Sequence, residues 1–180
     1  MVYVFLANGF EEIEGLTPVD VLRRAGIEVN TVGVGSGIIT GAHGIKVNTD
    51  ITVDDIKLND ELKMVVLPGG MPGADNLENC GEVSAAVDFC ADKDRFIAAI
   101  CAAPKILGHK GLLAGREAIC FPGFEQELFG AELSESPVVR DGKLITGKSA
   151  GVALKFALKL VEALTSEENA EKLGASMICR

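Results

Sequence analysis

Short apolar runs rich in β-branched residues alternate with helical stretches along this chain. Such an alternation predicts a doubly wound, mostly parallel sheet with helices on both faces, because two parallel strands need a crossover between them. The runs that we interpret as strands are Val2–Leu6, Val29–Val34, Met64–Leu67, Phe96–Ile100, Glu117–Phe121, Val138–Arg140 and Leu144–Thr146.

The segments between these runs show helical spacing of apolar residues. Thr17 and Pro18 resemble the N-cap and first position of a helix that stops at Ala25-Gly26. Ser149 is a candidate cap for the helix that follows it. Gly41–Asp50 alternates as a small added hairpin would. The other predicted helices are Val83–Ala91, Val152–Leu164 and Ser166–Gly174.

Length and composition indicate one globular domain over residues 1–180, because 48% of the residues are hydrophobic and no internal repeat is visible. The formal net charge of −9 argues against nucleic acid as the primary partner. Five irregularly spaced cysteines fit neither a disulfide framework nor a zinc site. We see no signal peptide or membrane span, and therefore expect a cytoplasmic protein without a membrane partner.

Two glycine patterns resemble phosphate-binding loops, and we reject both. Gly142–Ser149 matches G-x-x-x-x-G-K-S, but Leu144–Thr146 inside it is a strand, and Asp141-Gly142 reads as a hairpin turn. Gly33–Gly37 lacks the last glycine of a dinucleotide loop and leads into another extended segment. We therefore predict no nucleotide cofactor.

Cys101 lies where a predicted buried strand, Phe96–Ile100, turns into a helix. A helix N-terminus presents unpaired N–H groups and partial positive charge, which stabilise a thiolate and a nearby anion. Nucleophile elbows are built in this way. The alternative is a small buried core residue, which is how we interpret the remaining cysteines: Cys80, Cys90, Cys120 and Cys179.

The loops after two other strands supply candidate partners for this thiol, since ligands bind beyond the carboxyl ends of parallel strands. The loop with Gly69-Gly70 is either a tight turn or an anion-binding nest of backbone N–H groups. The carboxylates after Val2–Leu6 are either a solvated first helical turn or include one inward-facing acid. Glu14 is the best candidate for that acid, because Ile13 and Leu16 suggest a partly buried segment.

Histidine is scarce, and neither of the two suits a Cys-His pair. His109 follows Cys101 by eight residues on the same predicted helix, about 12 Å along its axis. His43 is either an exposed loop residue or a group that reaches the site from a partner subunit.

Several segments together resemble the ThiJ/PfpI superfamily, in the branch of the parkinsonism-associated protein deglycase. The resemblance covers nearly the whole chain. Its segments are Val4–Glu14, Pro18–Gly26, Val66–Gly70, Ala99–Pro104 and Phe156–Leu164.

This resemblance implies a flavodoxin-like α/β domain that forms a homodimer. Cys101 matches the elbow nucleophile, and Glu14 matches an acid that contacts its sulfur as a protonated carboxyl. Gly70 and Ala102 match the two residues whose N–H groups form an oxyanion hole. The implied activity is conversion of methylglyoxal, glyoxal or their early glycated adducts without a cofactor or metal. Oxidative-stress sensing, with Cys101 oxidised to sulfinate, and redox chaperone action are the alternatives.

The chain departs from this family pattern at two positions. Protease and amidase members carry histidine directly after the nucleophile, where this chain has Ala102, so an intracellular protease or amidase is the least favoured function. Phe121-Pro122 stands where the deglycase branch often has His-Pro, which removes one proton-transfer group. We therefore expect a thiolate assisted by a carboxyl.

Overall fold

A seven-stranded, mostly parallel sheet forms the centre of the computed structural model, which describes residues 1–179. The spatial order is β10-β11-β7-β6-β1-β2-β5, and only β10 pairs antiparallel, with β11. The strands are β1 (Val2–Leu6), β2 (Val29–Gly33), β5 (Ile51–Thr52), β6 (Met64–Leu67), β7 (Phe96–Ile100), β10 (Val138–Asp141) and β11 (Leu144–Gly147). The predicted fold class is confirmed.

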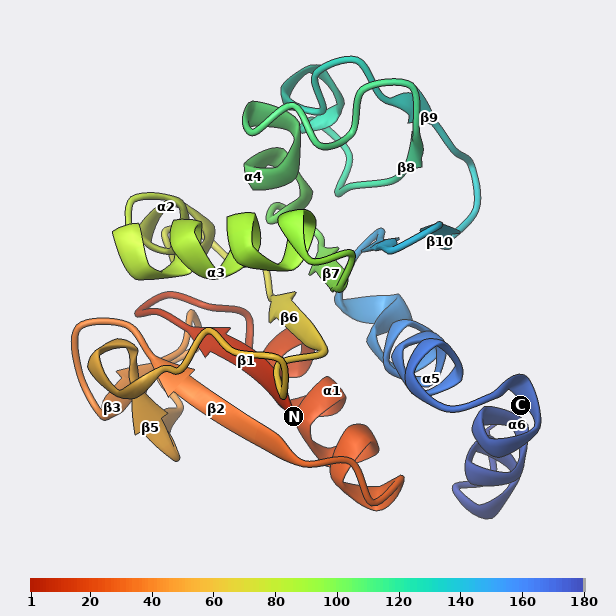
Figure 1. Ribbon diagram of the computed structural model, residues 1–180, viewed down its shortest axis with the longest axis horizontal. Coiled ribbons are helices and arrows are strands. Elements are labelled where there is room, and N and C mark those ends of the chain that lie inside the picture. Colours follow the sequence, from red (N-terminus) through yellow and green to blue (C-terminus); the bar gives the residue numbers. More distant parts are fainter. Residues whose placement is uncertain (180) are drawn as a thin grey trace.

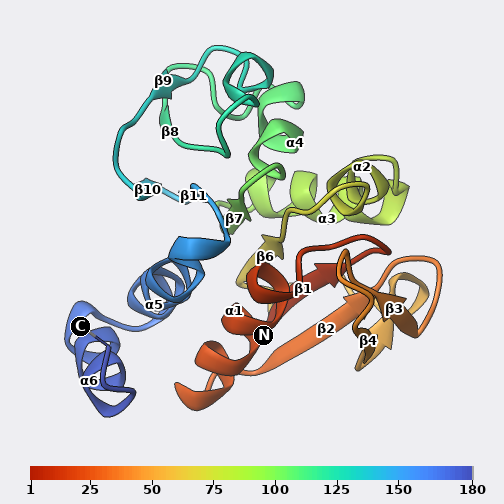
Figure 2. The ribbon, with the colours of Figure 1, turned by 180° about the vertical axis from the view of Figure 1, so that it is seen from behind.

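Helices cover both faces of this sheet, as Figures 1 and 2 show. On one face lie α2 (Gly73–Glu78), α3 (Gly81–Asp92) and α4 (Pro104–His109). On the other lie α1 (Glu12–Arg24), α5 (Ala153–Leu164) and α6 (Glu167–Ser176). None of the helices in residues 1–179 has the length and apolar character needed to cross a membrane.

Alternating residues of β1 divide the core into two parts. Tyr3 and Phe5 pack on the face with α3 and α4, whereas Val2, Val4 and Leu6 pack on the face with α1 and α5. Successive strand side chains point to opposite faces, so a strand buried on both sides is apolar throughout.

Smaller elements lie outside the main sheet. The predicted hairpin exists and begins earlier than expected, with β3 (Ile38–Thr40) paired antiparallel to β4 (Lys46–Asn48). The segment Gly142–Ser149, which we rejected as a phosphate-binding loop, contains the turn of the β10–β11 hairpin and the strand β11. Residues 1–179 include three short 3-10 turns, η1 (Val53–Asp55), η2 (Glu125–Glu127) and η3 (Ala150–Val152). Helix α2 (Gly73–Glu78) was not predicted from the sequence.

Two predicted helix starts were wrong. Helix α1 begins five residues before Thr17, because Glu11 is the N-cap and its carboxylate accepts the N–H of Glu14 at 2.8 Å. Pro18 therefore lies inside this helix. Ser149 precedes the η3 turn without a side-chain capping bond, and α5 begins only at Ala153.

The predicted strand Glu117–Phe121 was also wrong. Only β8 (Glu117–Ala118) is extended and paired, with β9 (Glu132–Leu133) in a separate two-stranded sheet. The next N–H, of Ile119, donates to the buried Thr146 hydroxyl at 3.0 Å, so a side chain ends the backbone pairing.

The sheet reverses its winding direction at β1, since β2 and β6 lie on either side of it. The loops after β1 and β6 consequently meet at the carboxyl edge, where Glu11 N–H donates to Gly69 O at 2.9 Å. Gly70 lies in this contact with φ of 86°. A Cβ there would lie 2.4 Å from the Glu11 nitrogen and 2.6 Å from the Gly9 oxygen.

We predict that Gly70→Ala destabilises the protein far more than Gly35→Ala. Both glycines have positive φ, but a Cβ on Gly35 would meet no atom within 4 Å. Backbone strain alone should lower the free energy of unfolding by about 1–2 kcal/mol at Gly35. The clash at Gly70 should add about 1–3 kcal/mol. Urea unfolding measures both losses, and equal losses would contradict the prediction.

Candidate active site

Cys101 occupies a strained turn between β7 and α4. Its φ is 65°, in the left-handed region that few residues other than glycine adopt. Its N–H donates to Gly147 O at 2.9 Å and its carbonyl accepts the Phe121 N–H at 2.8 Å. These two hydrogen bonds hold a conformation that costs about 1–3 kcal/mol. A reactive residue on a strained strand-to-helix turn is the geometry of a nucleophile elbow.

Glu14 brings a buried carboxyl to the same turn. It is 1% exposed, and its Oε2 accepts the N–H of Gly69 at 2.9 Å. Within residues 1–179, the other oxygen, Oε1, is buried without a hydrogen-bond partner. A Cβ on Gly69 would lie 2.7 Å from both Cys101 Cβ and Glu14 Oε2. Only glycine at position 69 lets the acid and the thiol approach each other so closely.

Burial raises the pKa of Glu14 to about 7, against the lowering effects of Cys101 and the Gly69 N–H. Burial, and then the charge of ionised Glu14, raises the pKa of the Cys101 thiol to about 12. An ionised Glu14 therefore disfavours a thiolate at Cys101. The Ala102 N–H near the N-terminus of the six-residue helix α4 lowers the pKa of this thiol, but by less than burial and Glu14 raise it.

The N–H groups of Ala102 and Gly70 both donate toward the Cys101 sulfur and lower its pKa. They come from two different loops, one after β7 and one after β6. The structure thus brings together all four predicted site residues: Cys101, Glu14, Gly70 and Ala102. Their catalytic roles stay predictions. Sequence reasoning did not assign roles to Glu11, which caps the helix that carries Glu14, or to Gly147.

Both histidines are engaged with carboxylates away from the sulfur. His109 ends α4, where its Nδ1 contacts Glu78 and its Nε2 lies 2.8 Å from Glu127 Oε2. His43 has a largely exposed side chain and pairs with Glu12 through Nδ1 at 2.7 Å.

One group among residues 1–179 has the spacing of metal ligands. Glu11, Glu12 and His43 offer ligand atoms within 4.8 Å of one another. Glu12, however, already accepts from the backbone N–H of His43 at 2.7 Å and also contacts its ring. Hydrogen bonds within the loop account for this arrangement, so we assign it no metal.

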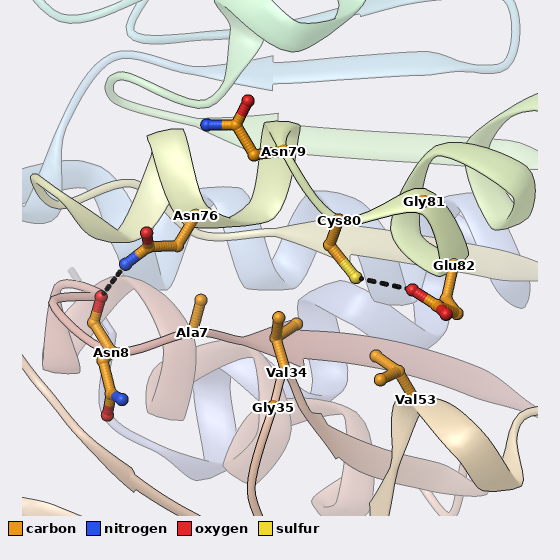
Figure 3. A pocket seen from close by; sticks show the side chains of 10 residues that line it. All are labelled: Ala7, Asn8, Val34, Gly35, Val53, Asn76, Asn79, Cys80, Gly81 and Glu82. Atoms are coloured by element: carbon orange, nitrogen blue, oxygen red, sulfur yellow. Dashed lines mark hydrogen bonds between the residues drawn. The ribbon is translucent and has the colours of Figure 1, made fainter.

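The other cysteines differ in exposure. Cys90 and Cys120 are buried as expected, but Cys80 and Cys179 are only half-buried. Cys80 borders a cavity of about 460 Å³ beside the loops after β1 and β2, where its Sγ donates to Glu82 Oε2 at 3.2 Å (Figure 3). Cys101 does not line this cavity, so Cys80 provides a reference thiol for experiments.

We predict that stability falls with rising pH because of Glu14. An acid whose pKa is higher in the folded state stabilises the protein fully below the unfolded value of 4.5. That contribution is lost as the pH rises through about 7, and amounts to about 2–3 kcal/mol between pH 5 and 8. Urea unfolding at pH 5 and pH 8 measures this loss. The free energy of unfolding of Glu14→Gln, relative to that of the wild type, should be higher at pH 8 than at pH 5 by this amount. The exposed Glu171→Gln is the control, and parallel pH profiles for wild type and Glu14→Gln would contradict the prediction.

This chain is similar in sequence to several known proteins. The Arabidopsis thaliana protein DJ-1 homolog B is 35% identical over 99% of this chain, which spans only 41% of that protein. The chain thus spans less than half the length of that relative. The Caenorhabditis elegans glutathione-independent glyoxalase DJR-1.2 is 32% identical, over 91% of this chain and 87% of the relative.

The solved structures agree with these sequence relatives. The structure of oxidized DJ-1 from Toxoplasma gondii is similar with a TM-score of 0.93 and 33% identity, and the match covers 98% of this chain and 97% of that one. The family model described as DJ-1/PfpI family matches residues 1–163. With the fold, the elbow and these relatives in agreement, the chain belongs to the DJ-1/PfpI family.

Proposed function

We propose that this protein is a cysteine-dependent, cofactor-free enzyme of the glyoxalase or deglycase type. Its substrates would be methylglyoxal, glyoxal or their early adducts. The observation that carries the proposal is the buried carboxyl of Glu14, with an unpartnered oxygen, against the Cys101 thiol. The glyoxalase name of the Caenorhabditis elegans relative supports it.

The first step is addition of the Cys101 sulfur to the aldehyde carbon. For this addition, the proton of the Cys101 thiol moves to the Glu14 carboxylate, which leaves a thiolate beside a protonated acid. A carbon–sulfur bond forms and the carbonyl π electrons move to oxygen. Protonated Glu14 then gives its proton to this oxyanion, which yields a neutral hemithioacetal and leaves Glu14 as a carboxylate. The N–H groups of Gly70 and Ala102 already converge on the sulfur, and in the reaction they would stabilise the adjacent oxyanion.

The second step moves a proton between the two substrate carbons. In methylglyoxal, Glu14 would remove the proton from the former aldehyde carbon and return it to the former ketone carbon through an enediol. The first carbon is oxidised to a thioester while the second is reduced to an alcohol, so no external oxidant is required. Water then releases lactate and regenerates the thiol, for a net addition of one water to methylglyoxal.

Hydrolysis of a peptide bond finds less support in the same site. In a cysteine hydrolase, a histidine beside the nucleophile removes the thiol proton and then gives it to the leaving amine. Ala102 has no such group, and His109 is held by Glu78 and Glu127.

We also propose that the protein forms a homodimer and acts in the cytoplasm. Ile13 of α1 and Leu154 of α5 are large apolar residues that stay exposed, on two helices that pack against each other. Sedimentation equilibrium tests the dimer, and a monomer at micromolar concentration would contradict it.

We predict that Cys101→Ala abolishes lactate formation from methylglyoxal. Glu14→Gln should lower kcat by at least about 100-fold, the contribution typical of a general acid–base group. Cys80→Ala is the matched control and should keep wild-type turnover, since Cys80 lies at a separate cavity. Full turnover by Cys101→Ala would end the enzyme hypothesis. Assays of glyoxal and glycated adducts beside methylglyoxal identify the preferred substrate.

A redox sensor is the second candidate function. Protonated Glu14 could donate a hydrogen bond to a sulfinate oxygen on Cys101, and Gly70 and Ala102 N–H could bind the same anion. Mild peroxide should then oxidise Cys101 to sulfinate before the half-buried Cys80 and Cys179, as mass spectrometry would show. Earlier oxidation of Cys80 or Cys179, or an unoxidised Cys101, would argue against sensing.

A further inference from the structure

Lys105 is a buried lysine that joins two helices. It is 8% exposed, although lysine is rarely buried without a partner. Its ammonium contacts Asp75 and lies 3.4 Å from Glu78 Oε2. Both carboxylates belong to α2, and Lys105 belongs to α4. The ion pairs therefore connect α2 and α4 on the same side of the sheet (Figure 1).

Each end of this connection is close in the chain to one of the N–H donors at the sulfur. In the first turn of α2, Ala74 N–H donates to Gly70 O at 2.8 Å. Lys105 N–H in turn donates to Ala102 O at 3.4 Å. A shift of α2 relative to α4 would therefore change the separation of the Gly70 and Ala102 N–H groups.

A second contact holds the Glu78 side chain in place. Its other oxygen contacts His109 Nδ1, and His109 Nε2 lies 2.8 Å from Glu127 Oε2. The Glu78 carboxylate thus contacts two side chains of α4, Lys105 and His109. This arrangement restrains the carboxylate that Lys105 binds.

We propose that Lys105, through Asp75 and Glu78, is a positioning residue that sets the spacing of the two N–H groups facing Cys101. We call these three residues the α2–α4 clamp. Lys105 acts through backbone positions and does not touch substrate. The inference deepens the proposed function, because the same two N–H groups would bind the oxyanion.

The test measures alkylation of Cys101 by iodoacetamide across pH, with mass spectrometry to confirm the labelled residue. Lys105→Met should slow labelling at pH 7 by about tenfold, because one misplaced N–H loses a hydrogen bond to the thiolate. The pH midpoint should rise by about one unit. Lys105→Arg should restore labelling to within about threefold, since it keeps the charge and the ion pairs.

Lys110→Met is the matched control. Lys110, the C-cap residue of α4, also forms an ion pair, to Asp88 Oδ1 at 2.6 Å, but Asp88 belongs to α3. This substitution removes the same charge without affecting the link to α2. Labelling of Cys101 should stay within about twofold of the wild type.

The variant Asp75→Asn distinguishes positioning of the two N–H groups from a direct electrostatic effect of the Asp75 and Lys105 charges on the Cys101 thiol. If charge acted on the thiol directly, loss of a negative charge would speed labelling, whereas loss of Lys105 would slow it. The clamp predicts that both substitutions slow labelling, and that the double variant is no slower than Lys105→Met alone. Faster or unchanged labelling in folded Asp75→Asn overturns the proposal. Asp75 is partly exposed, so this variant also decides the question if Lys105→Met fails to fold.

Turnover of methylglyoxal gives a separate readout. If the enzyme is active, Lys105→Met should lower kcat with little change in KM, because an oxyanion hole acts mainly on the transition state. If the wild type shows no turnover, the proposed function fails, yet the labelling series still tests the clamp.

Discussion

The hydrogen bond from Gly69 N–H to the Glu14 carboxyl is the interaction on which the rest of the site depends. It joins the first turn of α1 to the loop after β6, where β1 and β6 are neighbours in the sheet. A buried carboxylate is costly unless it is paired or protonated. Within residues 1–179, one oxygen accepts a backbone N–H and the other has no hydrogen-bond partner, and burial raises the pKa of the carboxyl to about 7.

The proton of the Glu14 carboxyl determines the chemistry available to Cys101. Burial and a charged Glu14 both disfavour ionisation of this half-buried thiol, whereas the N–H groups of Ala102 and Gly70 favour it. In the proposed reaction, the same carboxyl would therefore serve as both the acid and the base at this sulfur. This arrangement fits a chain with Ala102, where histidine is expected in protease and amidase members, and with Phe121, where histidine is expected in the deglycase branch. It also explains how the site can do without His109, whose ring is held by two carboxylates.

The strands were predictable because runs buried on both faces are apolar throughout, and the elbow because Cys101 directly follows one of them. The start of α1 was not predictable, because the sequence does not distinguish the N-cap Glu11 from a solvent-exposed carboxylate. The end of β8 depends on the Thr146 hydroxyl, which pairs with Ile119 N–H across 27 residues of sequence. Long-range contacts of single side chains leave no periodic signal. Likewise, nothing in local spacing indicates that Lys105 meets Asp75.

Backbone conformation explains why the elbow is built from positions that are distant in sequence. Cys101 and Gly70 both have positive φ, and their loops bring two N–H groups to one sulfur. Cys101 is restrained on one side by Gly147 and on the other by Phe121, through backbone atoms alone. The restraint from Phe121 uses its backbone N–H, so this elbow does not require a histidine side chain there. In the proposed reaction, Glu14 would then be the one group that removes and returns the proton, working from one face of the substrate. Such a reaction yields a single enantiomer of the hydroxy acid, because the carboxyl reaches the enediol only from the α1 side.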